Sequence, residues 1–170
     1  MSFSPKVHLY LIRHAKAEAR GDAYPDDSLR PLTPAGHKQA KLLRRAFRQL
    51  ALRFDHLCSS PYSRAQQTAQ HLQSLAAQHH SLNALASEDY PRLLQELHSL
   101  SAAASDARIA LVGHEPWLSA LAWYLLADVA LAEKISMRKA SVLYLTGTGQ
   151  AGEMKLEWLL TPKLLRALLL

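Results

Sequence analysis

The chain has 170 residues, of which 49% are hydrophobic, and 20 Lys and Arg against 14 Asp and Glu give a formal net charge of +6. This length predicts one domain spanning residues 1–170, and the composition excludes a disordered or collagen-like chain. A single cysteine excludes an intramolecular disulfide and fits a reducing compartment, so we expect a cytoplasmic protein. The basic balance favours anionic partners without choosing among phosphorylated molecules, acidic proteins and nucleic acid.

The first predicted element is a buried strand. An apolar run at residues 7–12 ends directly on Arg13 and His14, and short apolar runs bounded by polar residues are typical of buried strands. Residues 15–32 follow as a polar stretch that is long for a connection in a compact domain, which predicts a functional loop.

Two helices with a strand between them come next. Thr33 and Pro34 predict a helix start, with Thr33 as N-cap and an apolar stripe of Ala40, Leu43, Phe47 and Leu50. A strand at residues 56–59 leads to Ser60-Pro61, which we interpret as a second helix start of the same kind. That helix is expected to bury Ala65, Ala69, Leu72 and Leu75, with His79 and His80 near its end.

The second half of the chain continues the alternation of helices and strands. We predict a helix over residues 92–103, a strand at 109–112, an apolar helix from 117 that is too short to span a bilayer, and strands at 140–146 and 153–160 joined by a glycine-rich turn. This order indicates an α/β fold, a three-layer α/β/α sandwich with a mainly parallel central sheet and one antiparallel edge strand from the final hairpin.

Three predicted strand ends carry side chains suited to an anion. They present Arg13-His14, residues 59–64 with Arg64 in the first turn of a helix, and Gly113-His114. Ligands of open α/β sheets bind beyond the carboxyl ends of the strands, so we expect these side chains to share one crevice. Arginine suits phosphate oxygens, and histidine supplies a nucleophile or a proton donor near neutral pH. No motif suggests a metal cage, so we expect no metal and no cofactor.

Four segments of the chain resemble, in order and spacing, the histidine phosphatase superfamily (branch 1), the phosphoglycerate mutase-like group. They are Leu11-Ile12-Arg13-His14-Ala15, Arg30-Pro31-Leu32-Thr33, Ser59 to Thr68, and Gly113-His114-Glu115-Pro116. The chain length, the Arg-Pro-Leu-Thr segment and the ending Trp158 to Pro162 resemble its small SixA-type phosphohistidine phosphatases. The resemblance implies a phosphoglycerate mutase-like fold.

The resemblance also implies a mechanism. His14 would attack phosphorus and become a transient phosphohistidine, while Arg13, Arg64 and His114 would bind the equatorial oxygens. Water would then release phosphate. Arg30 is expected to be a further phosphate contact. These roles agree with what phosphoryl transfer requires, which is mainly positioning and stabilisation of charge.

The general acid of larger family members has no diagnostic match. By position it would be Glu88, and Asp89, Asp22, Asp26 and Glu115 are alternatives, as is the absence of an acid. An imidazole leaving group can carry its proton before the bond breaks, whereas an alkoxide needs a proton in the transition state. Because the sequence identifies no firm general acid, a phosphohistidine substrate is favoured over a sugar phosphate.

We therefore expect a phosphohistidine phosphatase acting on a phosphorylated protein. The alternatives are a phosphatase of small phosphoesters on the same scaffold, a non-catalytic phosphate- or protein-binding module and, last, a nucleic-acid binder. The first long helix is basic, with Lys38, Lys41, Arg44, Arg45, Arg48 and Arg53, and is either a solvated face or a docking surface for an acidic protein. No aromatic residues interleave with these charges, so nucleic acid is not expected, and neither is a membrane.

Overall fold

The computed structural model describes residues 6–87, 89–102, 104, 106–126, 135–167 and 169. Its six strands form one sheet in the order β3-β2-β4-β1-β5-β6. The strands are β1 (Lys6–Arg13), β2 (Phe54–Ser59), β3 (Ala76–Ser81), β4 (Asp106–Gly113), β5 (Val142–Gly147) and β6 (Met154–Leu160).

Most of the sheet is parallel. β1, β2, β3 and β4 pair in parallel, whereas β5 pairs antiparallel with both β1 and β6. The final hairpin, β5–β6, therefore forms one margin of the sheet, and the predicted mixed α/β architecture is confirmed.

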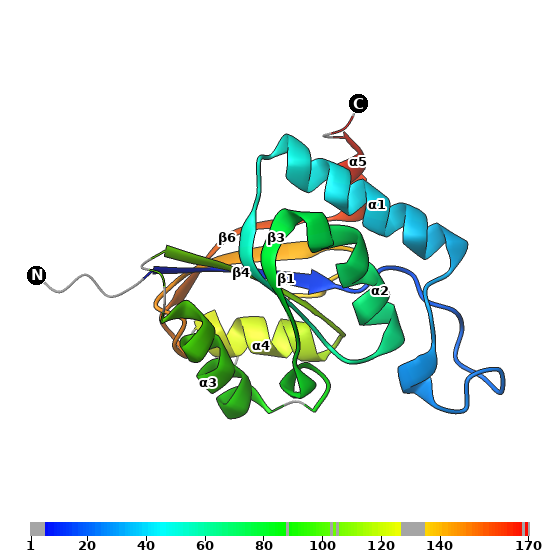
Figure 1. Cartoon of the computed structure of the whole chain (residues 1–170), viewed down its shortest axis with the longest axis horizontal. Helices are drawn as coiled ribbons and strands as arrows, with labels where there is room; N and C mark the ends of the chain where they lie inside the picture. Colours follow the sequence, from blue (N-terminus) through cyan, green and yellow to red (C-terminus); the bar gives the residue numbers. More distant parts are fainter. Residues whose placement is uncertain are drawn as a thin grey trace, which may run out of the picture.

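Helices cover both faces of the sheet (Figure 1). On one face lie α1 (Pro34–Gln49), α2 (Ser63–Leu72) and α5 (Pro162–Ala167), and on the other α3 (Tyr90–Ser101) and α4 (Trp117–Leu126). Three short 3-10 turns, Asp27–Leu29, Gln73–Leu75 and Asn83–Leu85, complete the described elements. No helix in the described part of the chain is long and apolar enough to cross a membrane.

The alternation of side chains along β1 explains the three layers. Leu9 and Leu11 point to the core beneath α3 and α4, whereas Tyr10 and Ile12 belong to the core beneath α1, α2 and α5. Successive residues of a strand face opposite sides, so a strand that is apolar throughout must be covered on both faces.

Three expectations about local structure are wrong. α2 begins at Ser63 after Tyr62, because Ser60 and Pro61 belong to the turn that precedes the helix. Residues 76–81, which include His79 and His80, form the edge strand β3 rather than the end of a helix. Leu50 caps the end of α1 and is 42% exposed instead of lying in the core.

Other boundaries differ less. The loop at residues 15–32 includes the 3-10 turn Asp27–Leu29 and is pinned at its base by a bridge between Ala17 and Leu32. Arg53, which we assigned to the basic helix, follows the end of α1 at Gln49. The last part of the apolar helix predicted from residue 117, positions 127–131, lies outside the described residues.

Candidate active site

Three neighbouring strands end at one edge of the sheet. Arg13 at the end of β1 pairs with Gly113 at the end of β4, and the His14 amide donates to the Gly113 carbonyl over 3.0 Å. On the other side of β4, the Ser60 amide donates to the Val112 carbonyl over 2.9 Å. The backbone therefore brings His14, His114 and the start of α2 to the same place.

His14 is held with one ring nitrogen engaged. Its Nδ1 lies 2.7 Å from the Ala15 carbonyl oxygen, an acceptor, so Nδ1 carries the hydrogen and Nε2 keeps its lone pair. The side chain is buried, and burial together with the nearby His114, Arg64 and Arg13 lowers the pKa of His14 to about 3 despite the hydrogen bond to Ala15. A neutral imidazole with a free Nε2 is a competent nucleophile at neutral pH.

His114 lies beside His14, with ring centroids 5.1 Å apart. Its Nε2 is 2.8 Å from the Ser60 hydroxyl oxygen, whereas its buried Nδ1 has no partner among the described residues. Burial and the charge of Arg64 lower the pKa of His114 to about 3, so this ring is also neutral at neutral pH.

Ser60 and Tyr62 are site residues that the sequence did not reveal. The Tyr62 amide donates to the Ser60 hydroxyl oxygen over 3.3 Å, and the Tyr62 ring lies 4.9 Å from the centroid of the His114 ring. The guanidinium of Arg64 also lies over the Tyr62 ring, at 4.9 Å from its centroid. The turn before α2 therefore orients both His114 and Arg64.

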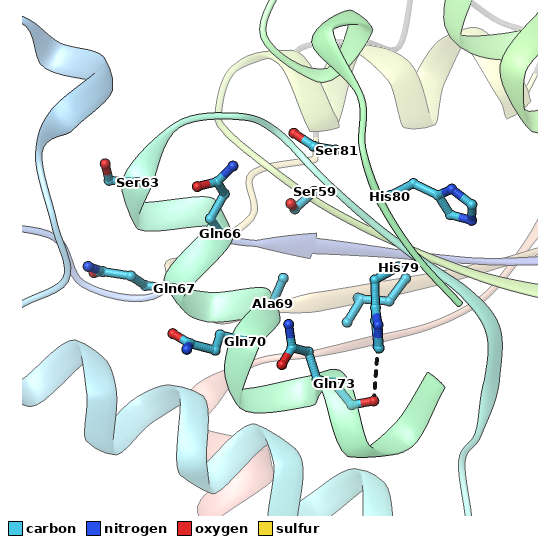
Figure 2. Close-up of a pocket in the computed structure, with 11 residues that line it drawn as sticks. Ser59, Ser63, Gln66, Gln67, Ala69, Gln70, Gln73, His79, His80 and Ser81 are labelled. Atoms are coloured by element: carbon cyan, nitrogen blue, oxygen red, sulfur yellow. Dashed lines mark hydrogen bonds between the residues drawn. The ribbon is translucent and has the colours of Figure 1, made fainter. Parts of the chain in front are cut away.

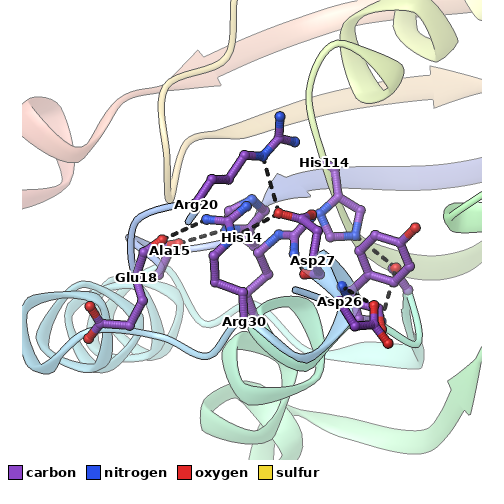
Figure 3. A network of polar contacts seen from close by, with 12 residues as sticks. His14, Ala15, Glu18, Arg20, Asp26, Asp27, Arg30 and His114 are labelled. Atoms are coloured by element: carbon purple, nitrogen blue, oxygen red, sulfur yellow. Dashed lines mark hydrogen bonds and ion pairs between the residues drawn. The ribbon is translucent and has the colours of Figure 1, made fainter. Parts of the chain in front are cut away.

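Arg64 and Arg30 meet at one carboxylate, that of Asp27, and Figure 3 shows Arg30 and Arg20 beside it. Arg64 donates to Asp27 Oδ2 over 2.8 Å and to the Asp27 carbonyl over 2.6 Å, and Arg30 Nε donates to Oδ1 over 2.9 Å. Arg20 reaches the same Oδ1 from the exposed side over 3.1 Å. Burial alone would raise the pKa of Asp27, but the hydrogen bond from Arg30 and the charges of Arg64, Arg30 and Arg20 outweigh it, so the pKa falls below its ordinary value.

Asp27 was not among the predicted site residues. Arg64 lies 37 positions further along the chain, so their contact is a tertiary one. The only local signal is the spacing of Asp27 and Arg30, three residues apart across the 3-10 turn. An ionised carboxylate that gathers three arginines occupies a place suited to an oxyanion.

Arg13 is anchored by the segment that precedes β5. It donates to the Met137 carbonyl over 2.6 Å, while its buried Nε has no partner among the described residues. The carboxylate of Glu115 lies behind it and accepts hydrogen bonds from the Met137 amide and the Ser119 hydroxyl. Burial lowers the pKa of Arg13, and the negative charge of Glu115 opposes that shift.

Several of these side chains line an open cleft of about 610 Å³. It contains Arg13, His14, Arg30, Arg64 and His114, and in addition Lys16, Arg20 and Lys139, which the sequence did not single out. The described residues include no group of three or more His, Cys, Asp or Glu side chains placed to hold a metal ion. The cleft is therefore rich in cations and neutral imidazoles.

Most of the predicted acids that the structure describes lie away from the cleft. Glu88 lies outside the described residues, and its neighbour Asp89 caps α3 by accepting from the Arg92 amide. Asp26 is exposed and accepts from the Ser28 amide, and Asp22 lines a separate depression in the loop. Of the four candidates that the structure describes, only Glu115 lines the cleft, and its carboxylate is held by Ser119 and Met137.

A glutamine-lined groove of about 450 Å³ lies apart from the catalytic cleft, between α2 and the edge strand β3 (Figure 2). Amide side chains of Gln66, Gln70 and Gln73 line one wall, and His79 and His80 line the other, with His79 Nε2 3.1 Å from the Gln73 carbonyl. No arginine or lysine is among the residues that line it. It therefore lacks the fixed positive charge that a phosphoryl group requires.

Comparisons with known proteins give a family model, a relative in sequence and similar solved structures. The family model for the histidine phosphatase superfamily (branch 1) matches residues 9–90. An uncharacterised protein from Picosynechococcus sp. (strain PCC 7002) is 35% identical over 133 residues, which make up 69% of this chain and 74% of that protein.

Solved structures share the whole fold. The protein histidine phosphatase SixA, complexed with tungstate, superposes with a TM-score of 0.78 at 19% identity, covering 92% of this chain and 97% of that one. A phosphoserine phosphatase of Entamoeba histolytica, in complex with 3-phosphoglyceric acid, gives a TM-score of 0.71 at 18% identity over 94% and 99% of the two chains. At these identities the likeness concerns the fold.

Proposed function

The chain belongs to branch 1 of the histidine phosphatase superfamily, and from that premise we propose that it hydrolyses phosphohistidine on a protein substrate through a phosphohistidine intermediate on His14. Membership of the superfamily and the fold support phosphatase activity in general. The observation that carries the proposal is the orientation of the His14 ring. Its Nδ1 donates to the Ala15 carbonyl, so its Nε2 keeps a free lone pair in a cleft lined by cations.

In the first step, His14 Nε2 attacks phosphorus and the bond from phosphorus to the leaving nitrogen breaks. The low pKa of His14 keeps the ring unprotonated, so no base is needed to activate it. In the second step, water attacks the phosphohistidine, phosphate leaves, and the His14 ring returns to its neutral form. Dividing the reaction into two displacements lowers the barrier of each.

Three groups stabilise the negative charge that develops on the equatorial oxygens of the transferred phosphoryl group. Arg13 and Arg64, which both line the cleft, supply guanidinium donors. His114 acts as a neutral donor through Nδ1, because the Ser60 hydroxyl accepts from the Tyr62 amide and so has its own hydrogen free to donate to His114 Nε2. The orphaned, buried Nδ1 then has the substrate oxygen as its partner.

The leaving group supports phosphohistidine as the substrate class. Among the described residues, Asp27 is ionised and bound by arginines, and Glu115 is held by Ser119 and Met137, so neither of these two carboxylates is set up to deliver a proton, and Glu18 is the remaining carboxylate that lines the cleft. A protonated imidazole leaves without such help, whereas an alkoxide does not. The cleft therefore suits a nitrogen leaving group better than an oxygen one.

The test compares donors and follows the enzyme itself. The protein is incubated with a phosphohistidine-bearing protein and, separately, with phosphoserine, and phosphate release and acid-labile phosphate on the enzyme are measured. We expect faster turnover of the phosphohistidine donor and an adduct that His14→Ala abolishes. His98→Ala is the matched control, because His98 is exposed on α3, on the other side of the sheet.

Two results would count against the proposal. A higher kcat/KM for phosphoserine would assign the site to phosphoesters. An adduct that persists in His14→Ala would move the nucleophile elsewhere.

A further inference from the structure

A second basic cleft adjoins the catalytic one. It has a volume of about 360 Å³ and its lining includes five cations: Arg13, Arg138, Lys139, Lys163 and Arg166. Arg13 and Lys139 also line the catalytic cleft, so the two hollows share a wall. Arg138 and Lys139 come from the segment before β5, and Lys163 and Arg166 come from α5.

Three of these cations, Arg138, Lys163 and Arg166, have no carboxylate partner among the described residues. No aspartate or glutamate lines this second cleft. Among the described residues, no carboxylate lies within 4.0 Å of the charged groups of Arg138, Lys163 or Arg166. By contrast, Arg30 and Arg64, which line the catalytic cleft, are both paired with Asp27.

Positive charges held close together without counter-ions repel one another, which is unfavourable. Binding of an anion would reduce this repulsion. Burial and the positive charges of Arg13, Arg30, Lys16 and Arg64 lower the pKa of Lys139, a sign of how crowded the cations are at the shared wall. The second cleft therefore has the electrostatics of an anion-binding site whose ligand also reaches the catalytic cleft.

The position of the cleft indicates a large ligand. Lys163, Arg166 and Arg138 are exposed, so the positive charge extends from the shared wall onto the outer surface. α5 lies against α1, whose exposed residues include Lys38, Lys41 and Arg45 (Figure 1). A single phosphoryl group is already served by the catalytic cleft, so these outer cations fit acidic side chains that surround it on a protein.

We infer that the cleft of Arg138, Lys163 and Arg166 is a docking site for acidic side chains of the protein substrate, next to the phosphohistidine being hydrolysed. This inference rests on the proposed function for its substrate. Its consequence is specificity: the enzyme selects phosphohistidines in acidic surroundings, and it does so through residues that do not touch the phosphoryl group.

The test uses two peptides of the same length that carry one phosphohistidine, one with glutamates around it and the other with glutamines in their place. At low ionic strength we expect kcat/KM for the acidic peptide to exceed that for the neutral one by on the order of tenfold, a difference that added salt removes. The double variant Lys163→Glu/Arg166→Glu should lose this preference and keep its kcat/KM for the neutral peptide. The matched control is Lys155→Glu, a charge reversal on β6 beside Thr146, at the far end of the sheet from the site.

The outcomes separate the two proposals. Equal kcat/KM values for the two peptides in the wild type, or an equal loss on both peptides in the double variant, would overturn the docking site. If neither peptide is hydrolysed, the proposed function fails, and binding of the unphosphorylated acidic peptide, followed by fluorescence anisotropy, still decides the docking site. The docking site is supported if the double variant binds the acidic peptide more weakly than the wild type while Lys155→Glu binds it equally well. It is refuted if the double variant binds the peptide as tightly as the wild type.

Discussion

Asp27 forms an ion pair with Arg64, a residue that lines the catalytic cleft, with Oδ2 of the carboxylate 2.8 Å from the guanidinium. Arg64 is only 4% exposed, and the same carboxylate also accepts from Arg30. A phosphoryl dianion that uses Arg64 must compete with this internal anion. Asp27 therefore holds the arginines in place before the substrate arrives and weakens the binding of a free anion.

The first prediction follows from that competition. Asp27→Asn removes the negative charge and keeps an oxygen that can accept from Arg64, so inorganic phosphate should inhibit more strongly, with a Ki lower by about fivefold, since a partly exposed ion pair contributes up to about 1 kcal/mol. The measurement is product inhibition by phosphate. Asp26→Asn is the control, because Asp26 is exposed and caps the 3-10 turn through Ser28. A weaker inhibition by phosphate in Asp27→Asn would show that ordering the arginines outweighs the competition.

Ser60 offers a test of how His114 is positioned. Ser60→Ala leaves the part-buried Nε2 of His114 without its partner, which costs about 1–3 kcal/mol and frees the ring to adopt the other tautomer. We expect kcat to fall by about tenfold or more with little change in KM, because the lost interaction acts in the transition state.

A double variant distinguishes positioning from a general loss of stability. If Ser60 acts through His114, then Ser60→Ala should reduce kcat no further once His114→Ala is present. Ser63→Ala, two residues past the turn that holds His114, serves as the matched serine control. Additive losses in the double variant would argue that Ser60 has a separate role.

The sequence was informative where burial is strong and less so elsewhere. The apolar runs of β1 and β4 marked two buried strands, and parallel geometry then brought Arg13, His14 and His114 to one edge. β3 was missed because Ala76–Ser81 is an edge strand with mostly exposed, polar side chains and no β-branched or aromatic residue. Periodicity carries little signal when only one edge of a strand is paired.

The missed site residues depend on tertiary contacts. Ser60 followed by proline has the pattern of a helix cap, yet its hydroxyl bonds to His114, 54 residues away. Asp27 lies in an irregular loop and gains its role only because α2 brings Arg64 beside it. Such pairs become visible only when the strands and α2 are placed in space.

Gly36 connects the stability of the fold to the site. A Cβ at this position of α1 would lie 2.0 Å from the carbonyl oxygen of Lys16, a backbone atom next to the residue that holds His14. Gly36→Ala should therefore lower the free energy of unfolding by about 1–3 kcal/mol, although a glycine-to-alanine change within a helix ordinarily raises it by roughly 0.5–1 kcal/mol. Urea denaturation measures the change, with the exposed Gln49→Ala of the same helix as the control. An increase in stability would mean that the segment at Lys16 moves freely away from α1.

The low pKa values of the two site histidines make stability depend on pH. In the folded protein both rings stay neutral down to about pH 3, whereas in the unfolded chain they take up protons as the pH falls through about 6.5. Between these limits the unfolded state binds more protons, so the stabilisation is complete above pH 6.5 and is lost progressively towards pH 3. Each histidine contributes a slope of at most about 1.4 kcal/mol per pH unit.

His14→Gln removes one of these groups, and its free energy of unfolding, measured by urea denaturation from about pH 7 to about pH 4, should fall less steeply than that of the wild type. His98→Gln, on the exposed surface of α3, should keep the wild-type slope. Parallel curves for the wild type and His14→Gln would mean that His14 becomes protonated as readily in the folded protein as in the unfolded chain, and the argument for a neutral nucleophile that needs no activating base would no longer hold.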